Sequence, residues 1–307
     1  MNPISSTLDA IHLAPAQSYL NLTLIPLLAN EPTPQAYLTL DEALERRLVS
    51  ITELTQSGSV PELRFDNLTD EQVLLLDGEE LVGAKQNRVL NITILVGGFA
   101  KIVIPVSCVE RGRWHHLSHE FRSARRHMFA RARAAKMAQV SMSLRSGGLR
   151  HSNQSEVWAD ISAKAERMKA HSETEAMADI YDSERPRLEG FERAFQPLVN
   201  QVGAVFAING QILGAELFDS DAAFKKLMGK LVGSYAMDAI EESVGQPATV
   251  SPESLKTFLE RIKDSSIESF PAIGNGQDLR LSGRGISGGA LVADGRVVHL
   301  SAFSVVA

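Results

Sequence analysis

The 307-residue sequence contains one cysteine, which cannot form a disulfide within the chain. A fold without disulfides suits a reducing compartment. The sequence also lacks any apolar run near the roughly 18 to 20 residues that a membrane-spanning helix needs. Its first residues do not show the basic and then apolar pattern of a signal peptide. We therefore expect a soluble, cytoplasmic protein without a membrane segment.

The familiar catalytic signatures are missing as well. The sequence contains no Walker or HExxH motif, and its paired glycines do not follow a strand and open a helix, as a dinucleotide fingerprint requires. His115, His116 and His119 have the spacing of metal ligands only on a helix, and no further ligand is fixed nearby. The sequence therefore predicts no metal site and identifies no cofactor.

Charge is distributed unevenly along the chain. The net charge of −6 argues against a general affinity for nucleic acid or membranes. Residues 111–150, however, contain ten Lys and Arg against one acid, Glu120, so this stretch carries +9 and the remainder −15. The basic stretch either forms an anion-binding surface or pairs with acids of the same protein or of a partner subunit.

The order of predicted elements indicates an α+β fold. Strand-like runs at residues 19–28, 49–55 and 62–67 suggest an antiparallel sheet over residues 18–114. Residues 119–140 follow a helical period and begin a helical middle segment. Asn209-Gly210 and Asp294-Gly295 are hairpin turns in the last third. We expect two β-rich parts with mainly antiparallel sheet, residues 1–118 and 201–307, around a helical segment at 119–200, all packed as one unit.

Residues 73–114 combine the groups most suited to chemistry. Glu79 and Glu80 follow an apolar run and an Asp-Gly pair, so either could act as a general base or bind a cation. Because neighbouring strand residues face opposite sides, both cannot enter one pocket if the strand continues. The alternative is an Asp-Gly turn with solvated acids.

A polar tetrad comes next, made of Lys85, Gln86, Asn87 and Arg88. Arg88 could bind a phosphate or carboxylate through two parallel hydrogen bonds, and the amide of Asn87 could hydrogen-bond to the polar edge of a ligand. The alternative is a polar turn or edge strand.

Cys108 lies in an apolar β-forming run. A catalytic cysteine needs a base or a positive field that lowers the pKa of its thiol. No such base is fixed by the sequence, so a buried structural cysteine is favoured.

Four segments together carry a family resemblance: LLLDGEELVGAKQNRVLN, IPVSCVERGRW, GAELFD and SYAMDA. They resemble the ARG and rhodanese-phosphatase-superfamily-associated protein domain family, in which ARG stands for ADP-ribosylglycohydrolase. The resemblance covers roughly residues 15–305 and implies a link to NAD and ADP-ribose metabolism without an established reaction. It points, without assigning roles, to Glu79, Glu80, Lys85, Gln86, Asn87, Arg88, Cys108, Glu110 and Trp114.

Two hypotheses follow. The first is a hydrolase acting on an ADP-ribose-like or nucleotide-derived substrate, with Glu79 or Glu80 as the catalytic carboxylate. The second is a non-catalytic module that binds nucleotide or RNA phosphates, or a structural interaction protein. The predicted ligand-binding residues are Lys85, Gln86, Asn87, Arg88, Glu110, Arg113, Trp114, Arg122 and Arg126.

Overall fold

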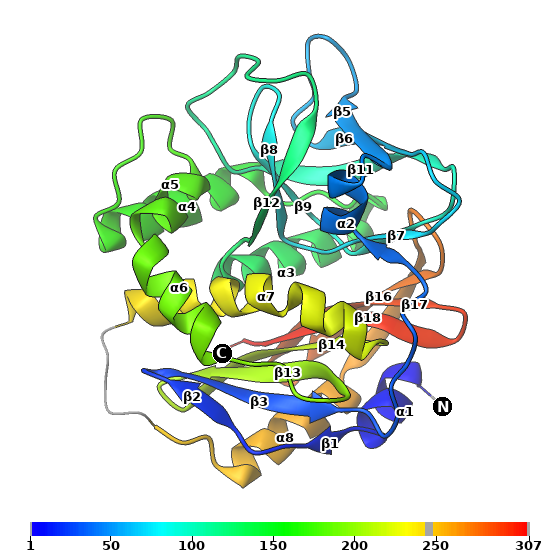
Figure 1. The fold of residues 1–307 in the computed structure, drawn as a ribbon, viewed down its shortest axis with the longest axis vertical. Helices are drawn as coiled ribbons and strands as arrows, with labels where there is room; N and C mark the ends of the chain where they lie inside the picture. The colour runs from blue at the N-terminus through cyan, green and yellow to red at the C-terminus, as the bar shows by residue number, and fades with distance from the viewer. Residues whose placement is uncertain (1, 243–247, 306–307) are drawn as a thin grey trace.

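The computed structural model describes residues 2–242 and 248–305 (Figure 1). These residues form an α+β fold with mostly antiparallel sheets, which confirms the predicted fold class. Two sheets lie on either side of a pair of helices, so the molecule is layered (Figure 1). This layering brings groups from distant parts of the sequence together.

The large sheet has the order β1-β3-β13-β14-β18-β17-β16-β15, with β2 beside β3. Its strands are β1 (His12–Leu13), β2 (Gln17–Tyr19), β3 (Leu22–Leu28), β13 (Gln201–Ile208), β14 (Gln211–Phe218), β15 (Ser266–Pro271), β16 (Gln277–Gly283), β17 (Ile286–Ala293) and β18 (Arg296–Ser304). Both predicted hairpins are confirmed: Asn209-Gly210 joins β13 to β14, and Asp294-Gly295 joins β17 to β18, all four with positive φ.

One part of the predicted organisation is wrong. The strand predicted at 19–28 was assigned to a sheet covering residues 18–114, but β3 pairs with β13 in the large sheet. The N-terminal strands therefore belong with the C-terminal ones, and a boundary at residue 118 does not separate the two sheets. Local pattern predicts a strand but not its partner, because pairing is decided by long-range burial.

The second sheet, which we call the curled sheet, has the order β12-β8-β9-β11-β6-β5. Its strands are β5 (Val49–Glu53), β6 (Glu62–Asn67), β8 (Glu79–Gly83), β9 (Arg88–Leu90), β11 (Lys101–Cys108) and β12 (Phe121–His127). Ser50 Oγ, on edge strand β5, donates a hydrogen bond of 2.7 Å to Glu120, which immediately precedes the other edge strand. The sheet therefore curves around its own apolar face. A short sheet of β10 (Ile94–Val96), β7 (Val73–Leu75) and β4 (Leu38–Thr39) lies next to it.

The basic stretch is not one helix, which corrects the prediction for residues 119–140. Residues 121–127 form β12, which pairs with β8, and the helix α3 (Ala130–Gly147) begins only after it. Arg125 has a φ of +54° and the β12 register shifts between Ser123 and His127, so the strand is irregular. The helical spacing of apolar residues continued by chance through this strand.

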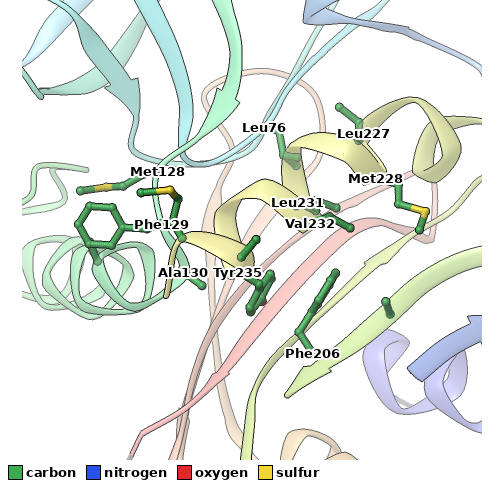
Figure 2. Packing of buried hydrophobic residues seen from close by; sticks show 14 of the residues in the cluster. Leu76, Met128, Phe129, Ala130, Phe206, Leu227, Met228, Leu231, Val232 and Tyr235 are labelled. Atoms are coloured by element: carbon green, nitrogen blue, oxygen red, sulfur yellow. The ribbon is translucent and has the colours of Figure 1, made fainter. Parts of the chain in front are cut away.

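Helices α3 and α7 (Asp221–Glu241) lie between the two sheets (Figure 1). Helix α7 is buried along most of its length, as expected for a helix between two layers, although its first half keeps one exposed face. Figure 2 shows its Leu231 and Tyr235 in this core, where Tyr235 stacks on Phe206 of β13 with ring centroids 4.0 Å apart.

The remaining helices cover the outer surfaces. They are α1 (Pro3–Asp9), α2 (Leu40–Glu45), α4 (Gln154–Met168), α5 (Met177–Ser183), α6 (Arg185–Ala194) and α8 (Pro252–Lys263). Helices α1 and α8 cover the face of the large sheet that is turned away from α7 (Figure 1). Among the described residues, no helix is long and apolar enough to span a membrane.

Candidate functional site

The two predicted catalytic carboxylates lie on opposite faces of β8. Glu80 is paired with Val89, and Leu81 with Arg88, so the side chain of Glu80 points away from the face that carries Arg88. The residues predicted to form one pocket are therefore divided between the two faces of the curled sheet.

Glu79 is fully buried and held by neighbours on all sides. It accepts a hydrogen bond of 2.8 Å from Leu76 N and forms an ion pair with Lys230 of α7, which also pairs with Asp41. Burial raises the pKa of Glu79, and the Lys230 ammonium opposes that shift. These contacts fasten α7 and α2 to the curled sheet, so the geometry supports a structural role for Glu79.

Glu80 is also fully buried, but its carboxylate has fewer polar partners than that of Glu79. Arg126 Nε lies 3.0 Å from Glu80 Oε2, yet neither carboxylate oxygen accepts a hydrogen bond with acceptable angles from the described residues. Burial, only partly offset by Arg126, raises the pKa of Glu80 to about 7. Arg126 lies over the ring of Tyr181, and both line a surface cavity of about 330 Å³. Arg126 thus separates a proton-binding carboxylate from this cavity.

Three of the predicted ligand residues hold one another in place. Arg113 donates to both carboxylate oxygens of Glu110, at 2.8 and 2.6 Å, and also to Asn87 Oδ1 and to the carbonyl oxygens of Gly83 and Ala84. Glu110 in turn accepts from Asn87 N at 3.0 Å. Burial raises the pKa of Glu110, but Arg113, together with the donors Asn87 N and Thr174 Oγ1, outweighs it, so the pKa lies below its usual value. This network fixes the chain between β8 and β9.

Arg88 is the centre of a different cluster, which we call the mouth because it lies at one end of the curled sheet's inner face. Its side chain has no exposed surface, and its Nη1 donates to Gln86 Oε1 at 3.1 Å. Its Nε and Nη2 have no hydrogen-bond partner among the described residues, and Glu53 Oε1 stands 4.0 Å from Nη2. Burial lowers the pKa of Arg88.

Two more predicted residues close the mouth from outside. Trp114, 47% exposed, lies with its ring centroid 5.9 Å from the Arg88 guanidinium and 5.2 Å from Lys85 Nζ. Lys85 Nζ donates to Ser57 O at 2.6 Å. A Cβ on Gly58 would contact Lys85, Trp114 and Glu53 together, so these side chains converge on the loop after β5.

Cys108 is part of the inner wall of the mouth. Its thiol is buried and donates to Gln86 Oε1 at 3.2 Å, the same oxygen that accepts from Arg88. Burial raises the pKa of the thiol, although Arg88 opposes this shift. A protonated thiol is a poor nucleophile, so the geometry favours Cys108 as a wall residue.

A family model matches residues 10–303 of the chain. The protein belongs to the ARG and Rhodanese-Phosphatase-superfamily-associated Protein domain family. No curated protein and no solved structure matches the chain. In this family member the mouth is where Lys85, Gln86, Arg88 and Trp114 come together.

Sequence reasoning missed Glu53, the carboxylate of the mouth. Both of its oxygens are buried and lack a hydrogen-bond partner among the described residues, and it lines a cavity of about 540 Å³ with His116 and His119. Strand alternation was a usable signal, since Ile51 and Glu53 share the buried face of β5. The mouth therefore offers a cation, a carboxylate and an aromatic ring beside a cavity.

Nine of the ten basic residues between 111 and 150 make ion pairs with acids among the described residues. The pairs include Arg125 with Glu45, Arg131 with Glu242, Arg133 with Glu216 and Lys136 with Asp77. The others are Arg111–Glu175, Arg113–Glu110, Arg126–Glu80, Arg145–Glu268 and Arg150–Asp278. The tenth, Arg122, is exposed and lines a separate surface cavity with Arg47 and Glu120, outside the mouth.

Within residues 2–242 and 248–305, no group of three or more His, Cys, Asp or Glu has an arrangement that could hold a metal ion.

Proposed function

We propose that the protein binds a small anionic metabolite derived from a nucleotide at the mouth. The observation that carries this proposal is the fully buried Arg88, whose Nε and Nη2 find no hydrogen-bond partner among the described residues. Buried donors are almost always satisfied, and leaving one unpaired costs about 1–3 kcal/mol, more for a charged group. A phosphate or carboxylate would accept from both nitrogens in the fork geometry that arginine favours.

The surroundings of Arg88 support a nucleotide over a simple anion. The indole of Trp114 offers a partly exposed ring on which a base can stack, and stacking of a base on an aromatic side chain contributes about 1–3 kcal/mol. Lys85 adds a second positive charge beside the same ring. The family resemblance implies a link to NAD and ADP-ribose metabolism, so these nucleotides should be tested first.

Binding can be measured by the change in melting temperature and by calorimetric titration with ADP-ribose, NAD, ADP, AMP and inorganic phosphate. Ligands that contain both base and phosphate should raise the melting temperature, because a ligand that binds only the folded state stabilises it. Arg88→Gln should abolish the shift and Trp114→Ala should weaken it. Arg122→Gln, at an exposed position of the same sheet, is the matched control and should bind normally. An equal response of wild type and Arg88→Gln to every compound would refute the proposal.

A second candidate function is hydrolysis at the anomeric carbon of an ADP-ribose-like substrate, with Glu53 as the carboxylate. The free, buried oxygens of Glu53 beside Arg88 favour this role, since a carboxylate can orient water or steady a cationic transition state. Turnover of ADP-ribose, NAD and ADP-ribosylated protein should then be lost in Glu53→Gln while binding remains. Loss of turnover in Glu80→Gln alone would instead place the chemistry at the carboxylate first predicted from the sequence.

Recognition of RNA phosphates has less support than either. Nine of the ten cations in the basic stretch pair with acids of the same chain, which leaves little free positive surface. A titration with single-stranded RNA should show weak binding without the steep salt dependence of multiple phosphate contacts.

A further inference from the structure

A second cleft lies at one end of the large sheet and shares no lining residue with the mouth. It has a volume of about 310 Å³ and is bordered by the end of α1, the segment after β3, the end of β14 and the start of β18. This volume is near the lower end of the roughly 300–1,000 Å³ that pockets for small molecules occupy. The cleft is open to solvent, so a small ligand can reach it directly.

Half of the twelve residues that line this cleft are apolar. They are Ala10, Ile11, Ala29, Val202, Phe218 and Val297. Val202, Phe218 and Val297 are almost fully buried, whereas Ile11 and Ala29 keep part of their surface exposed. An apolar group bound among them would remove hydrocarbon surface of both partners from water, which is favourable.

The charged residues that line the cleft are Asp219 and Arg296, which carry opposite charges. Arg296 Nη2 stands 3.9 Å from Asp219 Oδ2, which is too far for a hydrogen bond. Neither the Arg296 guanidinium nor Asp219 Oδ2 makes a hydrogen bond with the described residues. Both groups therefore have hydrogen-bonding capacity that a ligand in the cleft can use.

Asp219 is held in position from behind by Tyr37, which is 5% exposed and donates its hydroxyl to Asp219 Oδ1 at 2.7 Å. Burial and the nearby Asp219 raise the pKa of Tyr37, so its hydroxyl stays protonated and keeps donating. Burial also raises the pKa of Asp219, although Tyr37 and Arg296 oppose that shift. A further cation beside Oδ2 would offset this cost of burying the carboxylate.

We propose that this cleft binds a small α-amino acid with an apolar side chain. Its ammonium donates to Asp219 Oδ2, and its carboxylate accepts from the guanidinium of Arg296, whose side chain is 45% exposed and free to turn. An α-amino acid carries both charges on one carbon, which matches the short separation of the two protein groups. A ligand with a single charge leaves one of those groups without a partner. This inference does not depend on ligand binding at the mouth, because it uses other residues and another cavity.

The proposal can be tested by calorimetric titration of the full-length protein with L-leucine and L-valine. Three analogues of leucine each lack one recognised group: leucinamide lacks the carboxylate, 4-methylpentanoate lacks the ammonium, and glycine lacks the apolar side chain. Each should bind at least about tenfold more weakly than leucine, because hydrogen bonds between charged groups and burial of an apolar side chain each contribute that much or more.

Two variants place the binding in this cleft. Asp219→Asn keeps an acceptor for the Tyr37 hydroxyl but removes the charge, and Arg296→Gln removes the guanidinium; each should weaken leucine binding at least about tenfold. Arg284→Gln, at an exposed arginine in the hairpin between β16 and β17, is the matched control and should bind as wild type.

Circular dichroism of each variant separates loss of binding from loss of fold. The cleft is not an amino-acid site if the wild type binds neither leucine nor valine, or if the three analogues bind as tightly as leucine. Undiminished leucine binding by folded Asp219→Asn and Arg296→Gln would overturn the assignment as well.

Discussion

At the scale of single residues, Glu79 and Glu80 show how two adjacent carboxylates in one strand acquire different properties. Glu79 faces the Lys230 ammonium and a backbone donor, while Glu80 has only the partly exposed Arg126 at its side. Burial penalises the charge of both, but Glu80 has fewer groups that compensate. Glu80 is therefore the carboxylate whose protonation changes near neutral pH.

This property predicts the pH dependence of folding stability. The folded-state pKa of Glu80, about 7, lies above its ordinary 4.5, so the folded protein binds this proton more tightly than the unfolded chain does. The contribution of Glu80 to stability is fully present below about pH 4.5 and is lost as the pH rises through 7. Glu80→Gln should remove this loss and be more stable than wild type at pH 8 by on the order of 1–3 kcal/mol. Urea denaturation at pH 5 and pH 8 measures it; an equal difference at both values would contradict the pKa shift.

Arg113 is expected to contribute strongly to folding stability, because nearly all its N–H groups donate hydrogen bonds within the protein. Arg113→Ala would leave Glu110 buried without its cation and free two backbone carbonyls, so we expect a loss of about 3–5 kcal/mol. Arg113→Lys should recover little, since an ammonium cannot reproduce the bidentate fork. Arg111→Ala, at an exposed neighbour, is the control for urea denaturation and should be within about 0.5 kcal/mol of wild type.

At the scale of elements, the Asp77-Gly78 turn before β8 needs a glycine because helix α3 packs closely against it. Gly78 has a φ of +84°, and a Cβ there would stand 2.7 Å from Arg133 Cδ of α3. Gly78→Ala should therefore lower the free energy of unfolding by about 1–3 kcal/mol, from backbone strain together with displacement of Arg133. Gly229→Ala, in the exposed face of α7 with open space around it, should instead stabilise by about 0.5–1 kcal/mol. Opposite signs in denaturation experiments would confirm that position, and not glycine content, decides the outcome.

The elements that the sequence predicts well are those with local causes. Thr39 forms a full capping box with Glu42, and Ser251 caps α8 ahead of a proline, both as the residue pattern indicates. Ser172 and Glu175 have the spacing of a capping box, but α5 begins only at Met177. The strand β12 was missed because its pairing with β8 overrides a helical period, and α3 begins after Phe129 without a side-chain cap.

At the scale of the whole molecule, the contacts that the sequence does not predict are those between segments far apart in the chain. Residues 73–114 do contain the Lys, Gln and Arg of the mouth, but its carboxylate comes from Glu53, on a strand separated from β9 by β6 and β11 in the sheet. The hydrogen bond between Thr93 and His299 likewise joins residues 206 positions apart, which no local motif can predict. The basic stretch had two open interpretations, and the structure favours internal pairing, because acids from both sheets surround it.

The buried charges of α3 link the two sheets, and this link can be tested by mutation. Lys136 of α3 is fully buried and donates to Asp77, to Leu90 O at 2.8 Å and to Asn91 O at 3.2 Å. On the same helix, Arg133 pairs with Glu216 of the large sheet, so α3 links both sheets through buried charges. Lys136→Met should leave the buried charge of Asp77 with only Arg133 Nε, 4.0 Å away, to offset it, and cost about 3–5 kcal/mol.

If the loss arises from that charge, neutralising the partner should recover part of it. The double variant Lys136→Met/Asp77→Asn should therefore be more stable than Lys136→Met alone, with a coupling energy of about 0.5–3 kcal/mol in a double-mutant cycle.

Fluorescence of Trp114 and Trp158 reports on the curled sheet and the helix beside it, whereas far-ultraviolet circular dichroism reports on the whole chain. Coincident unfolding curves from the two probes in wild type would show that the sheets unfold together. Separate transitions, or a double variant no more stable than the single one, would mean that the buried charges of α3 do not couple the two sheets.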